Sequence, residues 1–288
     1  MKKIFKAILA ISIIGAMALG FAACGGNGGS DAIAVISREE GSGTRGAFVE
    51  LTGVEEKTAD GKKVDNTTAD AEIANKTDVV LTSVAGNEKA IGYISLGALN
   101  DTVKAVKVDG AEATVDNVKA GAYKLSRPFN IATKGEPTGV AKDFISFILS
   151  KEGQAVVTDN KYIAVNDAAE SFVSDGSSGQ IAVGGSSSVS PVMEKLIEAY
   201  KSVNPNASID LQTSDSTSGM TGAMDGTFAI GMASRELKDE EAAQLTGTAI
   251  ALDGIAVIVN PANTIDELSM DQIKSIYVGD ITDWGDLA

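Results

Sequence analysis

The fold is decided by residues 31–51, which read DAIAVISREEGSGTRGAFVEL. The first six of these residues have the apolar composition of a short buried strand, and a turn rich in Gly and Ser follows them. A helix is expected to begin near Arg45 and to reach Leu51. A strand, a turn and a helix in this order are typical of a layered α/β fold.

The same order of elements recurs further along the chain. Residues 181–183 predict a second buried strand before a turn rich in Gly and Ser, and the next helix carries Pro191 in its favoured first turn. Further strands are expected at residues 79–83, 90–95, 103–108, 209–212, 228–232 and 254–259, and further helices at residues 144–149, 154–157 and 271–277. Strands that alternate with helices favour an α/β class with mostly parallel pairing.

Composition excludes several functions. The 288 residues are 44% hydrophobic and 22% charged, which fits a globular protein. The 24 Lys and Arg against 39 Asp and Glu make nucleic acid a poor partner, because binding to phosphates needs clustered basic residues. The chain has no histidine, which rules out an imidazole base and a His-ligated metal. No cofactor is expected, and the lone Cys24 excludes an intrachain disulfide.

Residues 1–23 predict a signal peptide, with Lys2, Lys3 and Lys6 before an apolar segment. The segment ends at Cys24 in a pattern that resembles the bacterial lipobox, where a lipid is attached to the cysteine. Residues 24–30 would then be a flexible tether, and the protein would be extracytoplasmic and lipid-anchored to the bacterial cell membrane. A plain secretory signal with an incidental cysteine is the alternative.

Residues 166–180 are rich in Ser, Gly and Asp. This composition is typical of a linker, and it is equally typical of a long surface loop. Both interpretations stand at the level of the sequence.

The turn after the first strand has the composition of an anion site. A helix start presents unpaired backbone N–H groups. Ser42 and Thr44 would add hydroxyl donors to them, and Gly43 would let a ligand come close to the backbone. Arg38 would supply a forked cationic donor at one side. An ordinary helix cap beside a surface arginine is the alternative.

Three more clusters of small hydroxyl residues follow predicted strands. They contain Ser187 and Ser188, then Ser216 and Thr217, then Ser234. Four such clusters in an acidic chain suggest an oxyanion that is held by neutral hydrogen bonds and few formal charges.

These segments resemble the phosphate-binding lipoproteins of phosphate ABC transporters, the PstS-like branch of the periplasmic binding proteins. The matching stretches are residues 33–45, 90–94, 185–191 and 276–284. The resemblance implies a type II fold in which two α/β lobes, joined by a hinge, close on inorganic phosphate. It also implies delivery of the phosphate to an ABC transporter permease in the membrane.

The resemblance also implies the site residues. The phosphate ligands would be Arg38, Ser42, Gly43, Thr44, Ser187, Ser188, Ser216, Thr217 and Ser234. Glu40 stands where the family has an acidic partner for the arginine, whereas Arg45 and Arg127 are expected to be exposed. Some members of the family have an Asp at the position of Ser234, which places the selectivity for phosphate over sulfate in doubt.

The order of the segments differs from that of the family, in which the Ser187 segment comes first. Circular permutation is the simplest account. On that account residues 31–126 and 259–288 form a split lobe A, and residues 127–258 form a continuous lobe B that contains the linker.

Three other functions stay open beside phosphate transport. The protein could bind another tetrahedral oxyanion, or sense phosphate without transporting it. A serine hydrolase or phosphatase that uses Ser42 or Ser187 is less favoured, because the sequence offers no activating base. We therefore expect a binding protein rather than an enzyme.

Overall fold

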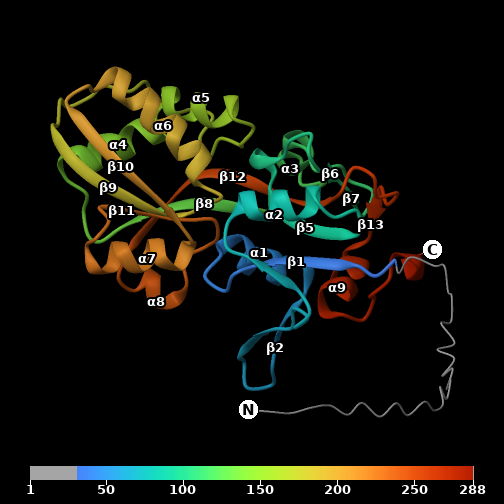
Figure 1. Ribbon diagram of the computed structural model, residues 1–288. Helices are drawn as coiled ribbons and strands as arrows, with labels where there is room; N and C mark the ends of the chain where they lie inside the picture. The colour runs from blue at the N-terminus through green and yellow to red at the C-terminus, as the bar shows by residue number, and fades with distance from the viewer. Residues whose placement is uncertain (1–30, 288) are drawn as a thin grey trace, which may run out of the picture. The chain divides into compact units, whose positions relative to one another are not determined.

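The computed structural model of the chain describes residues 31–287 (Figure 1). The expected signal peptide, the tether and Cys24 lie outside the described residues. The strands are β1 Ala34–Arg38, β2 Glu55–Lys57, β3 Lys63–Asp65, β4 Glu72–Ala74, β5 Ala90–Ser95, β6 Lys104–Ala105, β7 Lys107–Val108, β8 Ser126–Thr133, β9 Gly179–Ser186, β10 Ala207–Ser214, β11 Ile230–Ala233, β12 Thr246–Val259 and β13 Glu267–Leu268. The α-helices are α1 Gly43–Thr52, α2 Thr77–Ala85, α3 Val115–Lys119, α4 Gly139–Leu149, α5 Lys151–Asp159, α6 Ser190–Val203, α7 Ser216–Asp225, α8 Asp239–Ala242 and α9 Met270–Val278, with short 3₁₀ helices at Leu96–Ala98 and Trp284–Leu287.

One sheet runs through most of the described chain, in the order β10-β9-β11-β8-β12-β5-β1-β4, with β6 beside β12. The strands at both ends of this order pair in parallel, as expected for strands that alternate with helices. β8 and β12 are antiparallel to each other and to their outer neighbours. The expectation of mostly parallel pairing is therefore wrong for the centre of the sheet, where these two long strands pass between the two halves.

The buried apolar side chains form two main clusters, which we call the first and second cores. The first core includes Phe48, Tyr93, Ile258 and Tyr277. The second core is formed by side chains of β8, β9, β11, α4 and α6. Residues 255–259 of β12 belong to the first core, so β12 changes from one core to the other along its length.

Helices cover both faces of each half of the sheet. In the first half, a Cβ atom at Gly92 would meet Val80 and Val84 of α2. The next residue of the strand, Tyr93, stacks on Phe48 of α1 at 3.9 Å between ring centroids. Successive strand residues point to opposite faces, so α2 and α1 cover opposite sides. In the second half, Figure 1 shows α4, α5 and α6 on one side of the strands and α7 and α8 on the other.

The prediction of a strand at residues 79–83 is wrong, because these residues belong to the helix α2. Val80, Leu81 and Val84 are buried, which is the spacing of one helix face. A short apolar run has no alternation that distinguishes a strand from a buried helix. The other expected strands and helices are confirmed, although residues 103–108 contain two short strands instead of one.

Residues 166–178 contain neither a helix nor a strand. The buried carboxylate of Asp143 in α4 holds this segment, since it accepts hydrogen bonds from the Ser174 hydroxyl at 2.8 Å and the Asp175 backbone N–H at 2.9 Å. Tyr200 and Asn204 of the α6 end also donate to Asp143. Burial raises the pKa of Asp143, but these four hydrogen bonds outweigh it and hold the pKa below its ordinary value.

We expect Asp143→Asn to destabilise the fold by about 2 to 3 kcal/mol, because an amide group would face donors that now meet a carboxylate. Thermal unfolding measures this loss, with the exposed Asp159→Asn as the matched control. The depressed pKa means that Asp143 stabilises the fold above its unfolded pKa of about 3.9. The stability difference between wild type and variant should therefore shrink as the pH falls below about 4. A difference that does not change with pH would contradict the assignment.

The two ends of the described chain lie together. The Ile33 N–H donates to the Thr282 carbonyl at 2.8 Å, and the Trp284 N–H donates to the Asp31 carbonyl at 3.0 Å. Ala32 and Asp283 form an isolated antiparallel bridge.

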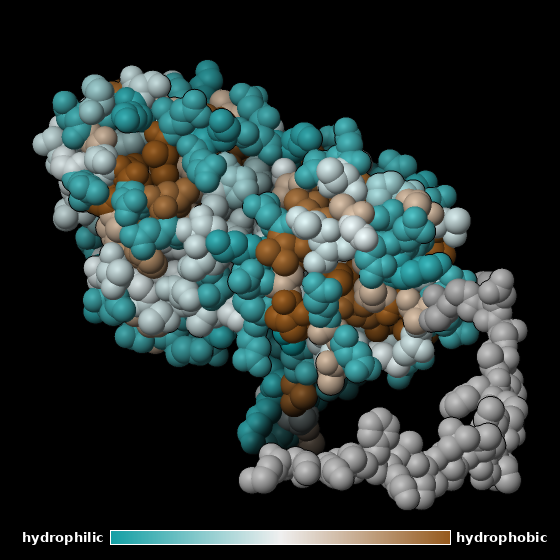
Figure 2. Space-filling model, in the orientation of Figure 1, coloured by the Kyte–Doolittle hydropathy of each residue, from teal (hydrophilic) through white to brown (hydrophobic). Residues whose placement is uncertain are grey.

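On the face drawn in Figure 2, hydrophilic residues surround separate hydrophobic patches. Among the described residues, no helix is long and apolar enough to cross a membrane.

Candidate functional site

The turn between β1 and α1 supplies the first part of the site. Ser42 caps α1, because its hydroxyl accepts a hydrogen bond from the Arg45 backbone N–H. Gly43 and Thr44 are the first two residues of the helix. Ser42 and Thr44 are 3% and 0% exposed, so these polar groups lie inside the protein. Gly43 lies close to two other hydroxyls of the site: a Cβ atom there would lie 2.4 Å from Ser216 Oγ and 2.8 Å from Ser234 Oγ.

Arg38 ends β1 and is 2% exposed. Its Nε and Nη2 donate to the two carboxylate oxygens of Glu39 at 2.9 and 2.8 Å. Its Nη2 also donates to the Ser187 hydroxyl at 3.1 Å. The expected role of Glu40 is wrong by one residue: Glu40 is exposed in the turn, and Glu39 is the carboxylate that pairs with the arginine.

The turn between β9 and α6 supplies a second group of hydroxyls, on Ser186, Ser187 and Ser188. All three residues are less than 9% exposed. Gly185 precedes them with φ of 135°, and a side chain there would meet the Met232 carbonyl at 2.4 Å. Glycine is required at this position, because the backbone of β9 passes so close to β11.

The remaining hydroxyls lie where α7 begins and where β11 ends. The Ser234 N–H donates to the Ser216 hydroxyl at 3.1 Å, and the Ser186 hydroxyl donates to Ser234 Oγ at 2.9 Å. Thr217 lies at the edge of this group, where its N–H donates to the Gly41 carbonyl at 3.1 Å. That bond joins the α7 turn to the α1 turn.

The structure brings together hydroxyls that come from the two halves of the sheet. Thr44 Oγ1 lies 2.8 Å from Ser188 Oγ and 3.4 Å from Ser234 Oγ. Seven of the nine predicted ligands therefore converge at this place, while Ser42 acts as the helix cap and Thr217 lies at the edge.

Two residues that were not predicted, Ser186 and Thr77 at the start of α2, lie beside these seven. We call all nine the hydroxyl cluster, which includes the guanidinium and the glycine that lie among the hydroxyls. Its members are Arg38, Gly43, Thr44, Thr77, Ser186, Ser187, Ser188, Ser216 and Ser234.

Sequence reasoning missed Thr77, whose hydroxyl lies 3.3 Å from Ser188 Oγ at the start of α2. It also placed Arg45 and Arg127 wrongly at the exposed surface. Arg45 pairs with Asp65 and donates to the Arg38 carbonyl, and its side chain is 14% exposed. Arg127 is 3% exposed and donates from Nη2 to Thr44 Oγ1 at 3.1 Å. Thr77 could have been found from its position, because it is a polar residue just before an apolar stretch that forms a helix. No local feature of the sequence indicates that Arg127 reaches the cluster.

Arg127 forms a buried ion pair with Asp253, at 3.1 Å between Nη2 and Oδ2. Burial lowers the pKa of Arg127 and raises the pKa of Asp253, while the charge of each group opposes the shift of the other. The opposite charges of the pair compensate each other, so the ion pair adds no net charge to the cluster.

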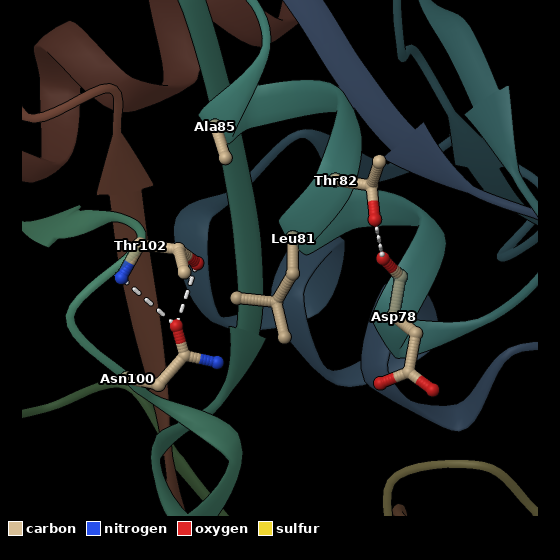
Figure 3. Close-up of a pocket in the computed structure, with 6 residues that line it drawn as sticks. All are labelled: Asp78, Leu81, Thr82, Ala85, Asn100 and Thr102. Carbon is tan, nitrogen blue, oxygen red and sulfur yellow. Dashed lines mark hydrogen bonds between the residues drawn. The ribbon is translucent and has the colours of Figure 1, made fainter.

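Other parts of the described chain offer less chemistry. No group of three His, Cys, Asp or Glu residues within 31–287 is placed to hold a metal ion. Figure 3 shows a pocket between α2 and the segment that contains Asn100 and Thr102. The Asn100 side chain in this pocket accepts hydrogen bonds from Thr102, and the lining contains no residue of the hydroxyl cluster.

Comparison with known proteins agrees with the α/β fold. Residues 5–152 and 171–288 match the family model of the PBP superfamily domain. The chain therefore belongs to this superfamily of binding proteins.

Two Streptococcus proteins narrow the assignment. Phosphate-binding protein PstS 2 of Streptococcus agalactiae serotype V is 50% identical over 294 residues, with 100% of both chains covered. A crystal structure of a phosphate ABC transporter phosphate-binding protein from Streptococcus pneumoniae TIGR4 has 50% identity and a TM-score of 0.71, and the match covers 89% of this chain and 100% of that one. The chain belongs to the PstS family of phosphate-binding proteins.

A more distant relative matches only in part. Phosphate-binding protein PstS of Bacillus subtilis is 34% identical over 143 residues, which is 49% of this chain and 44% of that protein.

Proposed function

We propose that this chain captures inorganic phosphate and delivers it to an ABC transporter permease. The observation that carries the proposal is the convergence of hydroxyls from both halves of the sheet beside the buried Arg38 guanidinium. Hydroxyl and backbone N–H groups donate to a tetrahedral oxyanion from several directions, and the forked guanidinium binds two of its oxygens. The names of the relatives support phosphate as the oxyanion.

The charges around the cluster fit a neutral site that accepts an anion. Arg38 is balanced by Glu39, and Arg127 is balanced by Asp253. Hydrogen-bond donors then provide the attraction, and burial strengthens them because the local dielectric is low. The formal charge of −15 on the whole chain is therefore compatible with binding of an anion.

Calorimetric titration of the mature protein with phosphate, sulfate and molybdate tests the proposal. We expect phosphate to bind with the largest affinity of the three. Absence of phosphate binding, or tighter binding of sulfate or molybdate, would contradict it and favour another oxyanion.

The contacts of the cluster argue against hydrolysis. Within the described chain, the hydroxyls of Ser187, Ser188 and Thr44 contact guanidinium groups and other hydroxyls. A guanidinium cannot accept a proton, and a neutral hydroxyl is a weak base, so these serines have no activating partner. The contacts support a binding role rather than an enzymatic one.

Discrimination between phosphate and sulfate requires an acceptor for the proton of hydrogen phosphate, and we assign that role to Ser234. We expect Ser234→Ala to lower the phosphate-to-sulfate affinity ratio by about tenfold, because an unpaired buried group costs about 1 to 3 kcal/mol. Glu40→Gln is the control, since Glu40 is exposed in the turn. An unchanged ratio in the Ser234 variant would move the acceptor to another residue.

We propose that the two cores belong to two lobes that close on the ligand: lobe A from residues 31–126 and 259–288, and lobe B from residues 127–258. β8 and β12 would form the hinge, because they are the strands that join the two halves of the sheet. The packing of residues 255–259 in the first core supports a second crossing within β12, a few residues before the end of lobe B given above. The bond between Thr217 and Gly41 would lock the closed form.

We propose that the mature protein is extracytoplasmic and anchored through a lipid on Cys24. The sequence pattern around Cys24 supports this assignment. A Cys24→Ser variant should move from the membrane fraction to the soluble extracytoplasmic fraction, and a variant that stays with the membrane would contradict the lipid anchor.

We propose that the segment order is a circular permutation of the family order. The contact between residues 31–33 and 282–284 supports it, because the ends of a permuted chain must have been joined in the ancestral order. The partial match to the Bacillus subtilis protein is also what two chains with different segment orders would give.

A rearranged protein tests the permutation. It begins at Ala169, runs through Ala288, continues through a short linker into Asp31 and ends at Ala168, which preserves the contacts of Asp143. We expect it to fold and to bind phosphate within about tenfold of the wild-type affinity, or about 1.4 kcal/mol. A rearrangement opened inside the buried strand β5 is the control that should not fold. A protein that is opened at Ala169 and folds but loses binding would contradict the proposal.

A further inference from the structure

Arg127 is placed differently from an ordinary surface arginine. It lies near the start of β8, and its side chain is 2% exposed. Within the described chain its Nε and Nη1 atoms are buried without a hydrogen-bond partner. Burial of a guanidinium in this state is costly, and the interactions that offset the cost are the ion pair with Asp253 and the hydrogen bond to Thr44.

Asp253 holds Arg127 in position from the neighbouring strand. The two residues are directly opposite each other in the antiparallel register of β8 and β12. The Asp253 side chain is fully buried, and the ring of Phe129 lies 5.1 Å from the Arg127 guanidinium carbon. Charge attraction and packing hold the guanidinium here, since Asp253 Oδ2 also has no hydrogen-bond partner among the described residues, and the Arg127 Nη2 atom donates to Thr44.

The direction of this hydrogen bond follows from chemistry. Arginine has no acceptor, so the Thr44 oxygen must accept the proton of Arg127 Nη2. The single proton of the Thr44 hydroxyl then points to another acceptor, in the region where Ser188 Oγ lies 2.8 Å away. Arg38 fixes the Ser187 hydroxyl in the same way. Each buried guanidinium thus occupies one lone pair of a cluster hydroxyl and directs the proton of that hydroxyl away from the guanidinium.

We propose that Arg127 is a positioning residue of the phosphate site, which holds the Thr44 hydroxyl as a donor toward an ionised phosphate oxygen while Asp253 keeps the guanidinium in place. The inference rests on the proposed phosphate binding and deepens it. A hydroxyl that is free to rotate can accept a proton from a P–OH group or donate to an ionised oxygen. The bond from Arg127 occupies one of the two lone pairs of the Thr44 oxygen and turns its single proton away from the guanidinium, so this side of the site favours an ionised oxygen.

The test removes both charges at once, because Arg127→Met alone would leave Asp253 buried and unpaired. Replacing a buried ion pair by apolar residues of similar volume often leaves stability unchanged. The Arg127→Met/Asp253→Leu protein is titrated with phosphate, in the wild-type background and in a Thr44→Val background, and Tm is measured for each. We expect about a 10- to 50-fold loss of affinity when Thr44 is present. The same replacement should change the affinity by less than about threefold in the Thr44→Val background.

Arg127→Lys with Asp253 intact provides a second variant, since an ammonium can also donate to Thr44. We expect it to retain more affinity than the Met/Leu protein at a similar Tm. Wild-type affinity in the Met/Leu protein, or an equal loss in the wild-type and Thr44→Val backgrounds, would overturn the inference. Absence of phosphate binding by the wild-type protein would instead overturn the proposed function.

Discussion

Arg38→Ala is expected to weaken phosphate binding at least about 100-fold, or about 2.7 kcal/mol. Charge-assisted hydrogen bonds contribute about 1.5 to 3 kcal/mol each, and a guanidinium can form two of them with one oxyanion. Burial of Arg38 at 2% exposure excludes the water that would replace those bonds. Titration calorimetry measures the loss, and Arg38→Lys should fall between wild type and Arg38→Ala, because an ammonium cannot form the planar fork.

Two matched controls separate this role from general effects of charge. Arg45→Gln removes another cation of the same turn, whose side chain pairs with Asp65 and donates to the Arg38 backbone carbonyl but contacts no hydroxyl of the cluster, and we expect less than about a fivefold effect. Glu39→Gln should weaken binding, since Glu39 orients Arg38 through two hydrogen bonds, whereas Glu40→Gln should not. Equal losses in the Arg38 and Arg45 variants would contradict the assigned role.

Gly43→Ala is expected to abolish measurable binding or to weaken it by more than about 100-fold. The added Cβ would lie 2.4 Å from Ser216 Oγ and 2.8 Å from Ser234 Oγ, which is too close for either pair of atoms. Ser216 Oγ can rotate away only by giving up the hydrogen bond from the Ser234 N–H. The substitution therefore either keeps the two halves of the site apart or removes donors from the cluster.

Gly46→Ala is the control, because it lies in the same helix and its Cβ would have Arg235 Cδ at 3.7 Å as the nearest neighbour. Alanine stabilises a helix relative to glycine by about 0.5 to 1 kcal/mol, so neither variant should lower the Tm through α1 itself. We expect near wild-type binding for Gly46→Ala. Normal binding by Gly43→Ala would show that the ligand does not lie between α1 and the α7 turn.

The expected closure of the site depends on the same geometry. Gly41 lies beside the Asp215 side chain, and a Cβ there would be 2.3 Å from an Asp215 carboxylate oxygen. Small residues at Gly41 and Gly43 thus let two turns from different halves of the sheet approach each other. The two glycines are close together in the sequence, but the groups that require them belong to the turn before α7, which is far away along the chain.

The sequence by itself determined the elements whose evidence is local. The apolar residues 33–36 and 90–94, each followed by polar residues, predict buried strands because burial of both faces leaves a continuous apolar run. The small hydroxyl residues at strand ends predict helix starts with free donors, and the structure places Thr44 and Ser216 in the first turns of α1 and α7 and Ser188 in the turn just before α6. The acidic composition made nucleic acid a poor partner, and the absence of histidine excluded an imidazole base and a His-ligated metal.

Only the tertiary structure decided which groups meet. The pairing of Arg127 with Asp253 arises from the antiparallel register of β8 and β12, and the choice of Glu39 over Glu40 depends on how the turn leaves β1. The residues 79–83 became a helix because one of their faces packs on β5. These outcomes depend on contacts between segments far apart in the chain, whose free energies no local pattern records.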